Sequence, residues 1–145
     1  MLKVLVAEDD LMIADMAEDF LVGCGYEVCG IARTVDEAVA LGLLHRPDLL
    51  VIDLRLADGG LGTEIPGRLT ALGRVGVLYA TGNMLMLLQN GADGDACLSK
   101  PYGFADLRRG LEIVAEIVAT GRATLPFPRG LQILRKPPVP AGHAG

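Results

Sequence analysis

Short apolar runs alternate with amphipathic segments along most of the chain, and this alternation limits the possible folds more than any other feature of the sequence. The runs read as buried strands at residues 2–7, 26–32, 49–52, 75–80 and 96–99. Helical spacing follows each run, at residues 11–22, 34–45, 83–90 and 104–118, with a weak helix that contains Leu69 and Leu72. Five strands alternating with five helices predict an α/β protein with a parallel sheet covered on both faces.

Local signals support three of the helix boundaries. Residues 11–22 place Ile13, Met16, Ala17 and Phe20 on one helical face, and glycines stop the helix directly afterwards. Thr34 is followed three residues later by a glutamate, which predicts a capping box at the start of the second helix. Asp10 is expected to cap the first helix.

Polar residues stand at the carboxyl ends of four of the five predicted strands. Parallel sheets collect function at this edge, so these side chains should converge. They are Glu8 and Asp9 after the first strand, Asp53 after the third, Thr81 after the fourth and Lys100 after the fifth.

The charges of this group predict a metal site. Three carboxylates and one lysine sum to −2, and carboxylates this close destabilise one another unless a cation joins them. Mg²⁺ suits a site with few carboxylates because it keeps several water ligands. Asp53 could then attack a phosphoryl group as a nucleophile, while Thr81 and Lys100 bind phosphoryl oxygens.

The motifs "VLVAEDD", "LLVIDLRLADG", "YATG" and "LSKP" resemble those of bacterial response-regulator receiver domains. The resemblance covers roughly residues 1–120 and implies a flavodoxin-like fold, with a five-stranded parallel sheet of order 2-1-3-4-5 and five helices. It further implies a single-domain response regulator of a two-component or phosphorelay system.

The resemblance also implies a role for each site residue. A histidine kinase or histidine phosphotransfer protein would phosphorylate Asp53, and the chain would assist its own phosphotransfer and dephosphorylation without being a conventional enzyme. Thr81 would be the switch hydroxyl, and Lys100 would contact the phosphate ahead of a Pro101 whose peptide bond is commonly cis in this family. The Mg²⁺ ligands would be Glu8, Asp9, Asp53 and the backbone carbonyl of Arg55.

Two positions depart from the usual receiver pattern. Cys97 stands where most receivers have the aromatic partner of the switch hydroxyl, and Ala57 stands where many have proline. "YATGN" resembles a subgroup with a Phe-Ala-Thr-Gly signature that lacks this aromatic residue and often consists of stand-alone receivers. Because Cys97 cannot swing as an aromatic ring does, we expect residues 81–83 and the following helix to move instead.

Other functions fit the residues less well. A phosphatase of the haloacid dehalogenase type requires Asp-x-Asp after the first strand, where Glu8 stands here, and a dinucleotide-binding domain requires a glycine-rich loop there. The alternative that stays open is a degenerate receiver that acts as a phosphorylation-independent binding module.

Charge and composition exclude further classes. Residues 1–121 hold all 18 acids and a net charge of −9, whereas the last 24 residues are +4 and rich in proline and glycine. We expect no DNA binding, because phosphate affinity depends on dense basic charge, no membrane span, and a cytoplasmic location. Residues 121–145 are predicted to be a tail without an effector domain, disordered over 137–145. Its "LQIL" (131–134) could dock on the domain or add to a partner's sheet.

The output surface is predicted at the helix 83–90, the strand 96–99 and the helix 104–118. The stretch "NMLMLLQN" has five consecutive apolar residues, of which a surface helix can bury only a stripe. At least two should therefore face solvent and allow homodimerisation or the docking of a partner.

Overall fold

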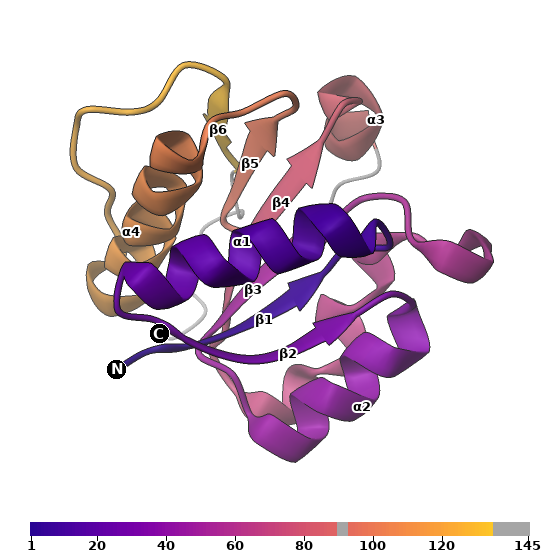
Figure 1. Cartoon of the computed structure of the whole chain (residues 1–145). Coiled ribbons are helices and arrows are strands. Elements are labelled where there is room, and N and C mark those ends of the chain that lie inside the picture. The colour runs from indigo at the N-terminus through magenta and orange to yellow at the C-terminus, as the bar shows by residue number, and fades with distance from the viewer. Residues whose placement is uncertain (90–92, 135–145) are drawn as a thin grey trace, which may run out of the picture.

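The computed structural model describes residues 1–89 and 93–134, and its centre is one six-stranded sheet of order β2-β1-β3-β4-β5-β6 (Figure 1). The first five strands pair in parallel, which confirms the predicted order 2-1-3-4-5. The sixth pairs antiparallel with β5. The strands are β1 (Lys3–Ala7), β2 (Glu27–Ala32), β3 (Leu49–Asp53), β4 (Gly76–Thr81), β5 (Ala96–Ser99) and β6 (Leu131–Ile133).

Helices cover both faces of the sheet, as predicted. On one face α1 (Leu11–Gly23) and α4 (Phe104–Thr120) pack on a buried cluster that includes Leu21 and Leu111. On the other, α2 (Val35–His45) and the short α3 (Met84–Gln89) pack on a second cluster (Figure 1). Asp10 caps α1 by accepting backbone N–H bonds, and Thr34 accepts one from Glu37, so both N-caps are confirmed. The predicted capping box is not complete, because the Glu37 carboxylate accepts the N–H of Arg33 rather than that of Thr34. Among the described residues, no helix has the length and apolar character that crossing a membrane requires.

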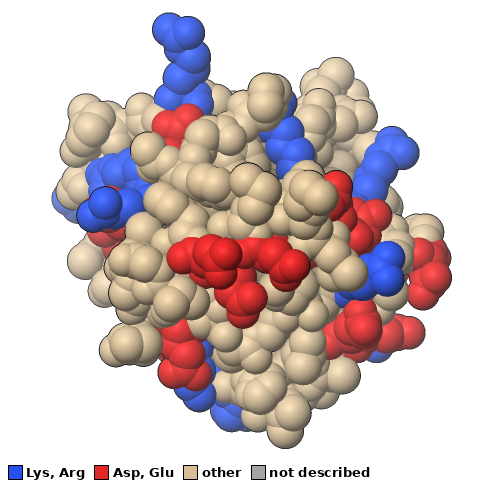
Figure 2. Space-filling view, in the orientation of Figure 1, with Lys and Arg blue, Asp and Glu red and all other residues tan. Residues whose placement is uncertain are grey.

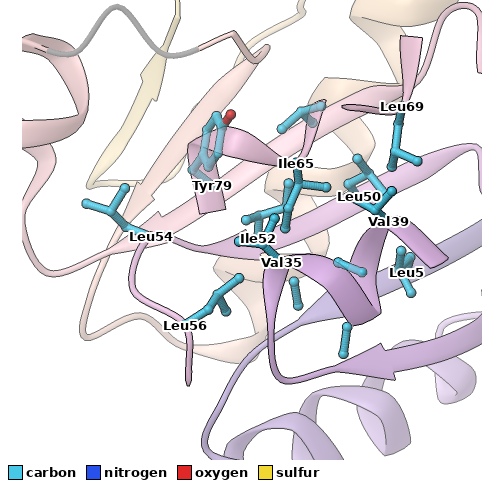
Figure 3. Close-up of a cluster of buried hydrophobic side chains, with 14 of the residues drawn as sticks. Leu5, Val35, Val39, Leu50, Ile52, Leu54, Leu56, Ile65, Leu69 and Tyr79 are labelled. Atoms are coloured by element: carbon cyan, nitrogen blue, oxygen red, sulfur yellow. The ribbon is translucent and has the colours of Figure 1, made fainter. Parts of the chain in front are cut away.

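The prediction of a helix between β3 and β4 is wrong. Four short 3₁₀ turns, at residues 57–59, 62–64, 66–68 and 70–72, stand in its place. The physical reason is composition: glycine and proline are the poorest residues in a helix interior, and residues 59–73 contain five glycines and Pro66. Ile65 and Leu69 still reach the cluster beneath α2, so the segment covers the sheet without a regular helix (Figure 3).

The C-terminal segment joins the sheet. The Ser99 N–H donates to the Gly130 carbonyl at 3.0 Å, and the Leu134 N–H donates to the Asp95 carbonyl at 3.0 Å, on either side of β6. The prediction that "LQIL" can dock on the domain is therefore confirmed, and the strand it adds to is the chain's own β5. The predicted disorder of 137–145, and the predicted end of the helix 83–90 at residues 90–91, lie outside the described residues.

Candidate functional site

The register of the sheet brings the predicted carboxylates together at its carboxyl edge. Ala7 pairs with Ile52, so Glu8 and Asp53 leave neighbouring strands at nearly the same level. One oxygen from each of Glu8, Asp9 and Asp53 lies within 4.8 Å of the other two. Glu8 is buried, and the other two acids are partly buried.

Lys100 follows β5, and its side chain reaches the carboxylates of Glu8 and Asp53. Its Nζ lies 3.3 Å from Oε1 of Glu8 and 3.4 Å from Oδ1 of Asp53. The Lys100 backbone N–H donates to the carbonyl of Thr81 at 2.9 Å, which ties the ends of β4 and β5 together. The peptide bond between Lys100 and Pro101 is cis.

Thr81 ends β4 next to the acids and is buried. Its neighbour Ala80 pairs with Asp53 across the sheet. The Thr81 hydroxyl oxygen accepts the backbone N–H of Asn83 at 2.9 Å, and Oδ1 of Asn83 accepts the backbone N–H of Met86 at 3.0 Å. Two hydrogen bonds thus run from the site into the first turn of α3.

A small hairpin follows Asp53 and turns the Arg55 backbone outwards. Arg55 pairs with Leu61 in an antiparallel bridge, and the bonds on either side run from Leu56 N–H to Gly60 and from Gly62 N–H to Leu54. In this pattern the bridged residues form the non-hydrogen-bonded pair. The carbonyl of Arg55 is therefore not used within the hairpin, as a metal ligand requires.

The ionisation of the site is set by burial and by its opposed charges. Burial raises the pKa of the Glu8 carboxyl to about 7, with a further contribution from the negative charge of Asp53. Burial alone would lower the pKa of Lys100, but the attraction of Asp53 and Glu8 leaves it raised. Lys100 therefore stays charged, while Glu8 retains a proton at pH values where an exposed glutamate has lost it.

The donor set fits Mg²⁺. All three side-chain donors are carboxylate oxygens, which a hard divalent cation prefers, and the Arg55 carbonyl is of the same kind. Oxygens bound to one Mg²⁺ lie about 3 to 4 Å apart, so small rotations would bring the three carboxylates into range. A proton on Glu8 competes with any such cation.

Mg²⁺ affinity should accordingly rise with pH. Below the Glu8 pKa a proton must leave before the cation binds, so affinity should fall about tenfold per pH unit below about 7 and level off above it. Calorimetric titration of the protein with MgCl₂ across this window measures both the affinity and the protons released. Glu8→Gln should bind more weakly with a flatter pH profile, and a wild-type affinity independent of pH would contradict the assignment.

An apolar pocket beside the site was not predicted from the sequence. It has a volume of about 430 Å³ and is lined by Ile13, Met16, Lys100, Pro101, Tyr102 and Phe104. The buried residues of α1 are Ala14, Ala17 and Leu21, and of these only Ala17 belongs to the apolar face that the sequence pattern selected. Ile13 and Met16 are exposed instead and form one wall of the pocket.

Tyr79 occupies the space next to the small Cys97. The two residues are paired across β4 and β5, and both are fully buried. The Tyr79 hydroxyl donates to the backbone carbonyl of Asp93 at 2.9 Å. The ring is therefore enclosed and hydrogen-bonded, and a swinging aromatic is absent from position 97.

Comparisons with known proteins agree with this architecture, although no protein-family model matches the chain. The phyllosphere-induced regulator PhyR of Methylorubrum extorquens is 36% identical over 80 residues, which are 54% of this chain and 30% of PhyR. The transcriptional regulatory protein PdtaR of Mycobacterium tuberculosis is 32% identical over 114 residues, 77% of this chain and 55% of PdtaR. The chain thus spans about half or less of these relatives. The non-phosphorylated HemR receiver domain of Leptospira biflexa is 25% identical with a TM-score of 0.66, over 86% of this chain and all of that domain.

Proposed function

The chain belongs to the receiver domains of bacterial response regulators, and we propose that it accepts a phosphoryl group on Asp53 in a two-component or phosphorelay system. The donor is a histidine kinase or a histidine phosphotransfer protein, and the output is contact with another protein. The observation that carries the proposal is the convergence of the Glu8, Asp9 and Asp53 carboxylates. Nζ of Lys100 lies within 3.4 Å of oxygens of Glu8 and Asp53.

The chemistry follows from these positions. A carboxylate oxygen of Asp53 attacks the phosphorus, and the bond from phosphorus to the donor's imidazole nitrogen breaks, so the electron pair leaves with the imidazole. Lys100 attracts one phosphoryl oxygen, and the Thr81 hydroxyl can donate to another. Mg²⁺ held by Glu8, Asp9, Asp53 and the Arg55 carbonyl would neutralise phosphoryl charge.

The pocket beside Lys100 is the surface on which we place the donor. Its walls are apolar, and α1, which also carries Asp15, Glu18 and Asp19, contributes Ile13 and Met16 to them. Figure 2 shows acidic side chains gathered over the middle of the face along which α1 runs. A donor helix with an apolar stripe and basic neighbours would match both features.

Met16→Glu should slow phosphoryl transfer from a protein donor about tenfold or more, because it adds a charge to the apolar pocket. Met12→Glu is the matched control, since Met12 lies on the same helix, is 74% exposed and does not line the pocket. Transfer is measured with a phosphorylated histidine phosphotransfer protein, with Mg²⁺ or with a chelator. Modification by acetyl phosphate should be the same in all three proteins. If both variants slowed transfer equally, the donor would have to bind at a surface other than this pocket.

The output is proposed to pass through α3. Leu87 is buried, whereas Leu85 and Leu88 are 66% and 43% exposed, so at least two of the five apolar residues face solvent as predicted. If the Thr81 hydroxyl turns towards a phosphoryl group, its bond to Asn83 is lost and the first turn of α3 loosens. α3 and α4 are thus the accessible parts of the proposed output surface, since β6 covers the free edge of β5.

Beryllofluoride with Mg²⁺ should therefore raise hydrogen exchange at the amides of Asn83 and Met86, by roughly tenfold. The amides of α2 serve as the internal control, because the hydrogen bonds that link Thr81, Asn83 and Met86 do not extend to that helix. Exchange is followed by mass spectrometry or NMR on the full chain. Unchanged protection across 81–89 would reject this switch and leave the phosphorylation-independent binding module as the better description.

A further inference from the structure

Residues 122–134, the C-terminal strap, run from the end of α4 to the outer edge of β5. β6 is its last part, and the register pairs Leu98 with Leu131, Cys97 with Gln132 and Ala96 with Ile133 (Figure 1). The bonds from Ser99 to Gly130 and from Leu134 to Asp95 continue the ladder beyond both ends of β6. The strap thus uses the backbone groups that an edge strand offers to an added strand.

Two leucines anchor the strap on opposite faces of the sheet. Leu131 packs with the cluster beneath α4, close to Gly110. Leu134 is buried in the other cluster together with Tyr79 and Leu87. The edge of β5 therefore has an apolar recess on each side, and each is filled by one residue of the strap.

A polar clamp on α4 holds the beginning of the strap. Arg109 donates to the carbonyls of Thr124 and Pro126, at 2.6 and 3.0 Å. Glu116 accepts the backbone N–H and the hydroxyl of Thr124, at 2.9 and 2.8 Å, and is itself paired with Arg109 at 3.2 Å. Most of these bonds go to backbone groups of the strap, so Arg109 and Glu116 could hold another extended chain with different side chains in the same way.

The strap is held by few side chains. Leu125 is 78% exposed, and Phe127, Gln132 and Ile133 are exposed as well. Leu134 is the one buried side chain of residues 122–134, and Ala123, Pro128 and Leu131 are partly buried. The strap also carries two arginines and no acid, against a net charge of −9 for residues 1–121. A three-residue edge strand with so little burial opens at low free-energy cost.

We propose that the outer edge of β5, with Arg109 and Glu116, is a binding site for an extended segment of a partner protein, and that the strap is its resident ligand. The partner segment pairs with β5 as an antiparallel strand, places apolar side chains in the two recesses and carries basic rather than acidic neighbours. The site goes beyond the proposed function, because pairing along β5 requires no phosphoryl group on Asp53.

The test is binding of a labelled peptide of residues 124–134 to the full chain, measured by fluorescence anisotropy without phosphoryl donor. In wild type the tethered strap competes at an effective concentration of about millimolar, so Gln132→Pro, which removes a backbone donor from β6, should bind the peptide roughly tenfold or more tightly. Gln132→Ala keeps the backbone donor at an exposed position and should behave as wild type. Thr124→Pro weakens the strap at its clamp and serves as the second variant if Gln132→Pro does not fold.

Further arms define the site. Arg109→Ala in the Gln132→Pro chain should weaken peptide binding. Arg108 pairs with Glu112 on its own helix, so Arg108→Ala should leave peptide binding unchanged. A peptide with aspartate in place of Leu131 and Leu134 should not bind. Equal binding by wild type and both weakened variants, or no binding to a folded variant, would overturn the proposal. Dimerisation of the variants by strap exchange, seen by light scattering, would identify a second copy as the occupant and would also overturn it.

Discussion

Asp53→Asn is expected to abolish phosphoryl modification of the chain. The side chain keeps its shape at the end of β3, but an amide lacks the anionic oxygen that attacks phosphorus and removes the charge that Lys100 faces at 3.4 Å. Wild type treated with acetyl phosphate and Mg²⁺ should gain the mass of one phosphoryl group, and the variant should gain none. Intact-mass spectrometry in acid-quenched samples measures both.

Asp58→Asn is the matched control, because Asp58 is an exposed acid in the hairpin that follows β3 and lies outside the acid cluster. It should be modified like wild type. Labelling of Asp53→Asn at the wild-type level would place the phosphoacceptor elsewhere. Labelling of wild type in the presence of a chelator would remove the argument for the metal.

Gly62→Ala is expected to destabilise the chain and to distort the site. A Cβ at this position would overlap the carbonyl oxygen of Asp53 and the Cγ2 atom of Ile52, and neither can retreat without moving β3. We expect the free energy of unfolding to fall by about 3 kcal/mol, as in overpacked cores, and acetyl phosphate labelling to slow. Chemical denaturation and the mass assay measure the two effects.

The control for this substitution is Gly67→Ala. Gly67 lies in the same irregular segment, and a Cβ there would meet no atom within 4 Å. Its stability and labelling should stay close to those of wild type. If Gly62→Ala were as stable as Gly67→Ala, the hairpin would have to be displaced from Asp53 more easily than its contacts indicate.

The strand ends could be predicted because two simple rules combine there. Buried parallel strands are continuous apolar runs, and their carboxyl ends lie on one edge, so the meeting of Glu8, Asp53 and Lys100 follows from their order alone. The Glu8 pKa could not be predicted in the same way. It depends on how deeply that one carboxyl is buried, which only the packed structure determines.

The helix errors have different causes. In α1 the apolar spacing selected one face with Ile13, Met16, Ala17 and Phe20, but the small Ala14 and Ala17 face the sheet and let the helix approach closely, which leaves Ile13 and Met16 exposed. Between β3 and β4, spaced leucines gave a helical pattern that the glycines overrode. For "LQIL", composition indicated an extended apolar strand but could not choose between the chain's own sheet and a partner's.

The 3₁₀ segment between β3 and β4 also affects how the molecule fluctuates. Each of its turns is held by only one or two i→i+3 hydrogen bonds rather than by a continuous helical ladder, so the segment can open locally. It nevertheless contacts Asp53 through Gly62 and carries the outward-facing carbonyl of Arg55 at its base. Glu8 and Asp9 directly follow β1 in the packed sheet, whereas the backbone ligand Arg55 lies at the start of a segment with few regular hydrogen bonds. A cation that joined the two would lower the entropy of this segment, so order in the loop and occupancy of the site would rise together.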